Sequence, residues 1–183
     1  FQQLFDNVFK KLRKVRHYKP SQNVSLLMSM IVAGGERLSD IEHFAGDQTV
    51  CELFDMLSVP ADTSLRDDMH LIGQQDNARS ELLLQLNEML FEKANIRSII
   101  IDIDGTALPV DGHQESAEKG YCPAEQGSRC FQSVKAVCDT TETVIAEKTM
   151  SGNSHCAIEI IDFIRPWLDR LYGKLDFIKL RLD

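Results

Sequence analysis

The stretch Ser98-Ile-Ile-Ile-Asp-Ile-Asp-Gly-Thr-Ala-Leu-Pro109 decides the fold of the second half of the chain. Its apolar residues predict a buried strand over Arg97–Leu108, whose side chains alternate between two faces. One face then holds Ile99, Ile101 and Ile103, and the other holds Ile100, Asp102, Asp104 and Thr106. A carboxylate at the end of so apolar a strand loses solvation, so we expect it to bind a metal ion, to pair with a base or to take part in chemistry.

The last segment, Asp176-Phe-Ile-Lys-Leu-Arg-Leu-Asp183, has the same pattern, because an acid again follows an apolar strand. Two strands that bring carboxylates to the same edge of a sheet offer the hard oxygen ligands that divalent cations prefer. The two segments together predict a divalent-cation site.

The composition is that of an ordinary globular protein. With 43% hydrophobic and 26% charged residues, the 183-residue chain can bury a core in one large or two small domains. Its most apolar segment, Val24–Ala33, is too short to span a membrane, so no membrane partner is expected.

The chain starts with Phe1 and has no signal peptide, so we expect it to be cut from a longer protein. An odd number of cysteines without CxxC spacing favours a reduced cytoplasmic protein over a zinc ribbon or a disulfide framework.

The net charge of −8 counts against nucleic-acid binding, but the charge is unevenly distributed. Six basic residues against Asp6 give residues 1–20 a charge of +5, so the remainder carries −13. Apolar residues at helical spacing from Leu4 to Leu12 predict an amphipathic helix with basic residues opposite. This face either contacts DNA phosphates or is merely solvated. The candidate DNA contacts are Lys10, Lys11, Arg13, Lys14 and Arg16.

Helices are expected from residue 1 to about residue 95. Their predicted ranges include Ser25–Ala33, a helix opened by a capping box at Ser39–Glu42, Thr49–Leu57, and a helix that begins near Asp62. The longest begins at Asp76, and its predicted buried stripe is Leu82, Leu83, Leu86, Met89 and Leu90. We expect residues 1–95 to form a helical domain that binds DNA or mediates dimerisation.

The apolar pattern changes its period after residue 95, which predicts a second domain over residues 96–183. Arg129–Cys138 and Thr143–Lys148 are predicted to form an antiparallel hairpin, and a polar loop over residues 111–128 precedes it. A helix that begins at Asn153 or Ser154 and buries Trp167 then leads to the last strand. The expected fold class is therefore α+β.

Two families share a pair of acids at the end of an apolar strand. Asp102-x-Asp104-Gly105-Thr106 matches the first motif of haloacid dehalogenase-like phosphatases, in which Asp102 would be the nucleophile and Asp104 a general acid or base. That fold alternates strands and helices in a parallel sheet, which disagrees with the predicted hairpin.

Six segments, in their order along the chain, resemble DDE transposases of bacterial insertion sequences. They are Ala33-Gly-Gly-Glu-Arg-Leu-Ser-Asp-Ile-Glu42, Val59-Pro-Ala-Asp-Thr-Ser-Leu-Arg66, Ile101-Asp-Ile-Asp-Gly-Thr106, Gly112-His-Gln-Glu115, Lys119-Gly-Tyr121 and Lys179-Leu-Arg-Leu-Asp183. The resemblance implies a ribonuclease H-like domain of three antiparallel strands, a helix and a fourth strand parallel to the first. It also implies a transposase of a transposable element, found in the bacterial cytoplasm with the nucleoid, that acts on double-stranded transposon ends and target DNA.

The resemblance assigns Asp104 and Asp183 as the first two acids of the catalytic triad and as ligands of Mg²⁺ or Mn²⁺. The third acid, a Glu, would lie beyond Asp183, so the chain alone is expected to bind metal weakly and to be inactive. Asp102 has three open roles: phosphatase nucleophile, a neighbour that tunes Asp104 by charge repulsion, or the partner of a base. The remaining alternative is a DNA-binding or assembly fragment without catalysis.

Overall fold

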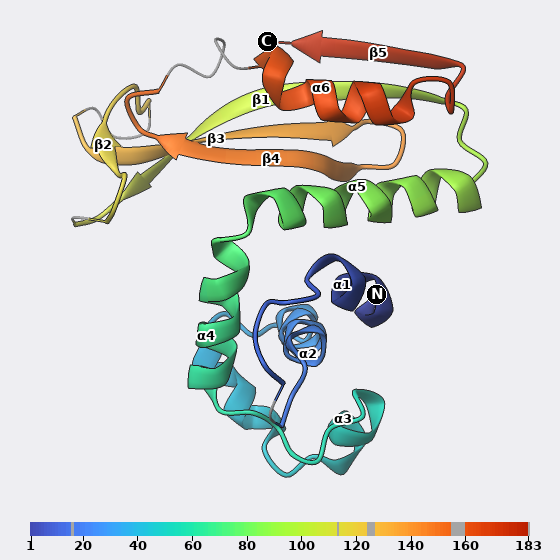
Figure 1. The fold of residues 1–183 in the computed structure, drawn as a ribbon. Helices are drawn as coiled ribbons and strands as arrows, with labels where there is room; N and C mark the ends of the chain where they lie inside the picture. The colour runs from blue at the N-terminus through green and yellow to red at the C-terminus, as the bar shows by residue number, and fades with distance from the viewer. Residues whose placement is uncertain (16, 113, 124–126, 155–159, 183) are drawn as a thin grey trace. The chain divides into compact units, whose positions relative to one another are not determined.

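The computed structural model describes residues 1–15, 17–112, 114–123, 127–154 and 160–182 (Figure 1). The chain forms two compact units, Phe1–Leu82 (unit 1) and Leu83–Asp183 (unit 2). Unit 1 is helical in its described part and unit 2 holds a mixed sheet, so the predicted α+β class is confirmed. None of the helices in the described ranges has the length and apolar character needed to cross a membrane.

Unit 1 consists of short helices around two apolar clusters. They are α1 (Gln2–Val8), α2 (Pro20–Val32), the 3₁₀ helix η1 (Leu38–Phe44), α3 (Gln48–Leu53), α4 (Asp62–Gly73) and the first part of α5 (Asp76–Lys93). One cluster buries Leu26, Met30, Ile41 and Leu65 among others, and the other buries Phe5, Phe9 and Ile72.

Two helices of unit 1 begin at other residues than predicted, and local hydrogen bonds explain why. Helix α2 begins at Pro20, five residues before the predicted start, because proline suits the first helical position and the Gln22 side chain accepts a hydrogen bond from the Lys19 amide at 2.8 Å. The predicted capping box at Ser39–Glu42 is wrong. Asp40, rather than Ser39, accepts the hydrogen bonds at the start of η1, from the backbone N–H groups of Glu36 and Arg37.

A buried ion pair holds α4 to the segment after α1. The Asp68 side chain is 1% exposed and forms a salt bridge with Arg13, whose Nη2 donates to Asp68 Oδ2 at 2.8 Å. The buried amide of Asn23 on α2 donates to the same Oδ2 at 2.8 Å. The hydrogen bond to Asp68 is the largest cause of the raised pKa of Arg13. Three segments of unit 1 therefore meet at one carboxylate.

Unit 2 is built on five strands: β1 (Ser98–Val110), β2 (Glu118–Lys119), β3 (Arg129–Cys138), β4 (Thr143–Ser151) and β5 (Phe177–Leu182). The central strand pair, β1 and β3, is antiparallel, and β4 pairs antiparallel with β3, which confirms the predicted hairpin. Short β2 also pairs with β3, and β5 pairs with β1 in parallel. Three antiparallel strands and a later strand parallel to the first are thus present.

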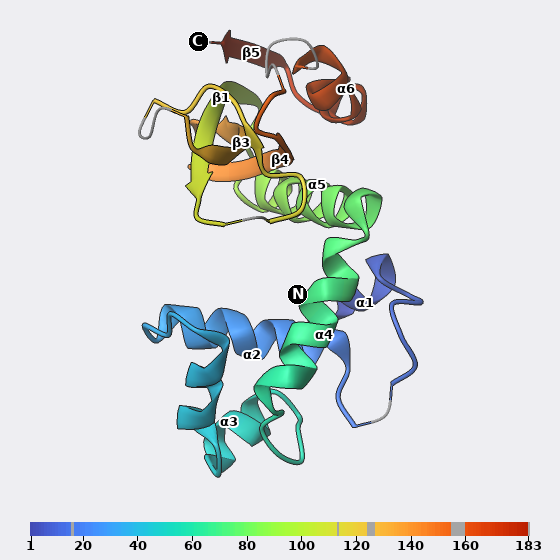
Figure 2. The ribbon, with the colours of Figure 1, turned by 90° about the vertical axis from the view of Figure 1, so that its left-hand side faces the viewer.

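Both helices of unit 2 cover the same face of its sheet, as Figure 2 shows. Ile99, Ile101 and Ile103 of β1 are at most 3% exposed and share one core with α5 and with α6 (Ile160–Leu171). Trp167 is 2% exposed in that core, as predicted. The alternation read from the sequence therefore places Asp102 and Asp104 on the opposite face of the sheet.

The predicted apolar stripe of α5 is confirmed at Leu82 and Leu83, which are half-buried against the apolar clusters, and is wrong at its end. The buried residues are Leu84, Asn87 and Phe91, whereas Met89 and Leu90 are 45% and 37% exposed. Asn87 is buried because its side chain is fully bonded. It donates to the backbone oxygens of Leu83 and Val144 and accepts from Thr143 Oγ1 at 2.7 Å.

Glu88 on α5 joins this helix to α6 and to the turn after it. Its side chain is 11% exposed and accepts hydrogen bonds from Arg170, at 3.1 Å for the nearest pair, and from Lys174. Burial disfavours the ionised carboxylate, but the hydrogen bonds from the two basic residues outweigh this effect and lower the pKa of Glu88. The stability that this contact adds is present above the unfolded pKa, about 4.3, and is lost as the pH falls through the lower folded pKa.

We expect Glu88→Gln to destabilise unit 2 at pH 7 by about 1.5 to 3 kcal/mol, the typical contribution of hydrogen bonds to a charged group. The difference from the wild type should shrink as the pH is lowered towards 3 or below. Trp167, the single tryptophan, reports unfolding of unit 2 by fluorescence in denaturant titrations. Exposed Glu92 on the same helix is the control, and Glu92→Gln should change stability by less than about 0.5 kcal/mol. An equal loss at every pH would contradict the role of the Glu88 charge.

Candidate functional site

The two acids of β1 differ in their partners. Asp102 is the register partner of Arg181 on β5, and the Arg181 guanidinium binds its carboxylate through both Nε and Nη2, the latter at 2.5 Å. Arg181 Nη2 also lies 3.2 Å from Asp139 Oδ2, just after β3. The pKa of Asp102 is lowered, first of all by the hydrogen bonds from Arg181. Among the roles left open by the sequence, Asp102 therefore has that of partner to a base.

Asp104 is the more available carboxylate. It is exposed on β1, and its Oδ1 accepts a hydrogen bond from the Gly105 amide at 2.7 Å. Its register partner on β3 is Lys135, yet within the described ranges no basic side chain forms a salt bridge with Asp104. This side chain can therefore accept a ligand without breaking an ion pair.

Strand β5 ends beside Asp104. Its parallel pairing with β1 runs from Ser98 opposite Phe177 to Ile103 opposite Leu182. Asp183, the predicted second acid, lies outside the described residues. That Asp104 and Asp183 lie close enough to share a metal ion therefore stays a prediction.

Of the two predicted ligands of a hard divalent cation, Asp104 is the one that lies in the described residues, and its chemistry suits such an ion. The Asp104 carboxylate supplies an oxygen of the kind that Mg²⁺ and Mn²⁺ bind. In the described part of the chain, no three His, Cys, Asp or Glu residues are grouped closely enough to hold a metal ion. Asp111 and Glu115 are exposed in the loop after β1, and His113 between them lies outside the described residues.

The predicted basic helix face is wrong. Helix α1 ends at Val8, so Lys10, Lys11 and Arg13 lie in the turns and bends that follow it, and Lys14 lies in irregular structure. Like charges three and four positions apart, as in Lys10, Lys11 and Lys14, disfavour a continued helix. These three lysines are exposed and remain candidate phosphate contacts.

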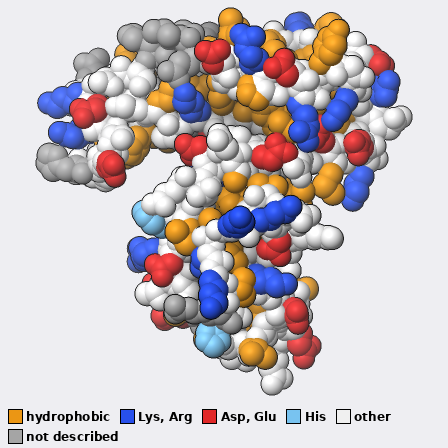
Figure 3. Space-filling model, viewed as in Figure 1, with side chains coloured by type: hydrophobic (Ala, Val, Ile, Leu, Met, Phe, Trp, Pro, Cys, Tyr) orange, Lys and Arg blue, Asp and Glu red, His pale blue; other side chains and the backbone are white. Residues whose placement is uncertain are grey.

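Arg13 is not a free DNA contact, because its guanidinium is bound to buried Asp68. Arg16, the fifth candidate, lies outside the described residues. On unit 2, acidic and basic side chains are intermixed over the visible face (Figure 3). Among the described candidates, the three exposed lysines of unit 1 remain, and the role of Arg16 stays a prediction.

The haloacid dehalogenase-like alternative is wrong. It requires a sheet in which parallel strands alternate with helices. Strands β3 and β4 instead form an antiparallel hairpin next to β1. Its proposed nucleophile, Asp102, is also held by Arg181.

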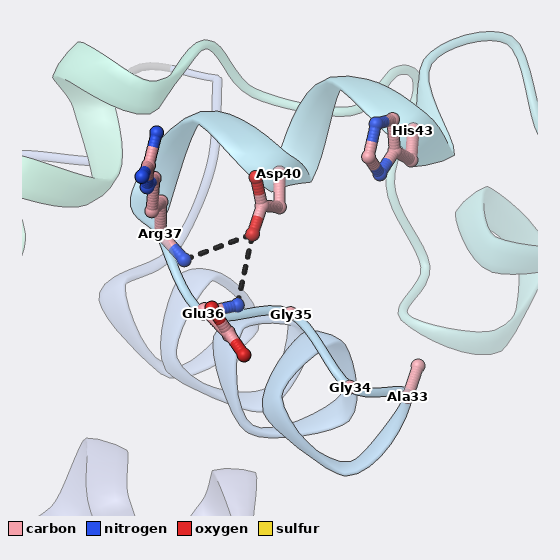
Figure 4. Close-up of a pocket in the computed structure, with 7 residues that line it drawn as sticks. All are labelled: Ala33, Gly34, Gly35, Glu36, Arg37, Asp40 and His43. Atoms are coloured by element: carbon pink, nitrogen blue, oxygen red, sulfur yellow. Dashed lines mark hydrogen bonds between the residues drawn. The ribbon is translucent and has the colours of Figure 1, made fainter.

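Unit 1 has a shallow polar pocket of about 380 Å³ (Figure 4). It is lined by Ala33, Gly34, Gly35, Glu36, Arg37, Asp40 and His43. The Asp40 carboxylate is turned towards the chain and accepts hydrogen bonds from the amides of Glu36 and Arg37 at 2.8 and 2.9 Å. These bonds lower the pKa of Asp40, that from Arg37 most. The Asp40 carboxylate thus stabilises the start of η1.

The sequence did not reveal the contacts of Arg181 and Asp139. Period-two alternation does place Arg181 two residues before Asp183 on the same strand face. Its partners depend on the register between β1 and β5, which a single sequence does not give.

No protein-family model matches the chain, and neither does any of the curated proteins. Among solved structures, a Mos1 transposase paired-end complex with the left transposon end is 8% identical with a TM-score of 0.27, over 88% of this chain and 50% of that chain. A Mos1 strand transfer complex is 9% identical with a TM-score of 0.27, over 93% and 52%. The chain thus spans about half the length of these transposases. TM-scores this low support no conclusion about its fold or activity.

Proposed function

We propose that this chain is part of a DDE transposase of an insertion sequence, which cleaves and rejoins DNA at the ends of the element. The observation that carries the proposal is the exposed Asp104 carboxylate on β1, next to the end of a parallel strand and without a salt bridge to any described residue. The strand directions of unit 2 agree with the ribonuclease H-like domain that the sequence resemblance implies.

In this proposal Asp104 and Asp183 are the first two metal ligands, and a third acid beyond the chain completes the set. Bound Mg²⁺ or Mn²⁺ would activate the attacking water or 3′-hydroxyl and stabilise the leaving oxygen. The chain's own part is to present the Asp104 oxygens from a strand fixed between two neighbours. The Gly105 amide orients one of these oxygens by its hydrogen bond.

The experiment that tests this function is a cleavage assay on duplex transposon ends, with a protein that carries this chain together with the third acid. Strand cleavage that needs Mg²⁺ or Mn²⁺ and that is followed by joining to target DNA supports the proposal. This chain alone should bind Mn²⁺ weakly and leave the DNA intact. DNA binding without metal-dependent cleavage, in the protein with all three acids, would favour the assembly fragment instead.

The helical part, residues 1–95, would bind DNA or pair two copies of the protein. Lys10, Lys11 and Lys14 are the proposed phosphate contacts, because all three are exposed and close in sequence. Lysines that neutralise phosphates release counterions, so their contribution appears in the salt dependence of binding.

We expect the triple variant Lys10→Ala, Lys11→Ala, Lys14→Ala to reduce the slope of log K against log salt by about 2.7, that is, about 0.9 for each phosphate contact. Fluorescence anisotropy with labelled duplex DNA across KCl concentrations measures this slope. The control variant Arg66→Ala, Arg79→Ala removes two basic residues of unit 1 that pair with Asp62 and Asp76, and it should leave the slope unchanged. An unchanged slope in the lysine variant would dismiss this segment as a DNA contact.

A further inference from the structure

One guanidinium joins three segments of unit 2. Arg181 on β5 binds the carboxylate of Asp102 on β1 with two nitrogens, and its Nη2 also contacts Asp139 Oδ2 at 3.2 Å. Asp139 in turn donates its backbone N–H to the Ile100 oxygen at 2.9 Å. The end of β5 is thereby tied to β1 and to the turn between β3 and β4.

Few other contacts hold this end of β5. Within the described ranges, β5 pairs with β1 alone and lies at the edge of the sheet. Leu182, the last paired residue, is 55% exposed, and Leu180 is 36% exposed. An edge segment with little apolar burial opens easily, so its position depends on its remaining contacts.

The other end of the same strand pair has a comparable ion pair. Arg97, just before β1, binds Asp176, just before β5, with its Nη2 3.0 Å from Oδ1. The Asp176 amide also donates to the Arg97 oxygen at 2.7 Å. Both ion pairs are exposed, but only that of Arg181 lies beside Asp104.

We propose that Arg181 is a positioning residue for the acidic site, which fixes the end of β5 next to Asp104 through its contacts with Asp102 and Asp139. This inference rests on the proposed metal-dependent function and goes beyond it by naming a residue that sets the ligand geometry. The planar fork of arginine binds one carboxylate with two nitrogens and still reaches a second, whereas lysine offers a single point charge.

Positioning and electrostatics predict opposite effects of removing this side chain. Arg181→Ala leaves Asp102 and Asp139 without their cation and makes the surroundings of Asp104 more negative. By electrostatics alone, Mn²⁺ would then bind more tightly. If Arg181 positions the site, Mn²⁺ binds more weakly despite the added negative charge, because the end of β5 is no longer held.

The test measures Mn²⁺ binding to the whole 183-residue chain by the loss of the free-ion signal in electron paramagnetic resonance. We expect Arg181→Ala to weaken Mn²⁺ binding by about 10-fold or more, because losing a group that orients metal ligands typically weakens binding by about 10- to 100-fold. The affinity of Arg181→Lys should lie between those of Arg181→Ala and the wild type. Arg97→Ala is the matched control and should bind Mn²⁺ like the wild type. Hydrogen exchange of the Leu182 amide should accelerate in Arg181→Ala alone, while the Trp167 unfolding midpoint changes little, because exposed ion pairs add little global stability.

Unchanged or tighter Mn²⁺ binding in Arg181→Ala, with binding lost in Asp104→Asn, would overturn the positioning role and leave the proposed metal site intact. Equally weakened Mn²⁺ binding in Arg97→Ala would also overturn the positioning role, because the effect would then come from loosening the β1–β5 pair as a whole. Mn²⁺ binding that is unaffected by Asp104→Asn would instead reject the proposed metal site and, with it, the role of Arg181.

Discussion

Asp104→Asn should reduce metal-dependent DNA cleavage by about 10³-fold or more in a protein that carries this chain together with the third acid. A metal ion supplies several kcal/mol of transition-state stabilisation, and each 1.36 kcal/mol corresponds to a factor of about ten in rate. Asparagine keeps the shape of the side chain and an oxygen for the Gly105 amide, but it loses the charge that attracts the cation. Because Asp104 is exposed, folding should be unaffected. Single-turnover cleavage at saturating protein separates this loss from weaker DNA binding.

Glu147→Gln is the matched control for Asp104→Asn. Glu147 is an exposed acid on β4, and both acids are register partners of Lys135, so the two lie on the same face of the sheet. The control removes the same charge two strands away and should retain cleavage within a few-fold. Equal losses in both variants would indicate a general effect of charge. Full activity of Asp104→Asn would reject the assignment of this acid.

Arg13→Ala is expected to destabilise unit 1 by about 3 to 5 kcal/mol, because it leaves the Asp68 carboxylate buried without a counter-charge. The Asn23 amide alone cannot compensate for the lost charge. Thermal or urea unfolding followed by circular dichroism at 222 nm should show an early helical transition. Trp167 fluorescence should still report a later transition of unit 2.

Lys14→Ala is the neighbouring control. Lys14 is exposed, and its substitution should alter stability by less than about 0.5 kcal/mol while it reduces the salt dependence of DNA binding. The double variant Arg13→Met, Asp68→Leu should recover much of the lost stability, because it removes both charges from the interior. If Arg13→Ala lowered DNA affinity and left unfolding unchanged, Arg13 would be a DNA contact after all.

The sheet of unit 2 could be predicted from the sequence because its strands have strong local patterns. Ile99, Ile101 and Ile103 recur with period two in a run of apolar residues, and the range of β3, Arg129–Cys138, was predicted to the residue. The face of Asp102 and Asp104 followed from the same alternation. These features depend only on neighbours in the chain, so a single sequence contains them.

The errors concern residues whose surroundings are set by distant parts of the chain. Arg13 looked like one of several exposed bases, since nothing local marks Asp68, 55 positions later, as its partner. Asn87 interrupts an apolar helix, and its burial depends on Thr143 in the hairpin. Arg181 was missed because its two acids come from β1 and from the turn after β3, and neither strand register nor strand order is a local property.

The anchoring of Arg13 has a consequence for how its neighbours would meet a ligand. A free basic tail loses conformational entropy when it becomes ordered on DNA, and this loss subtracts from affinity. Here the salt bridge already fixes the chain at Arg13, which lies between Lys11 and Lys14, so the backbone near each lysine has less freedom to lose. Association through these residues should therefore carry a smaller entropic penalty than that of a fully disordered arm with equal charge.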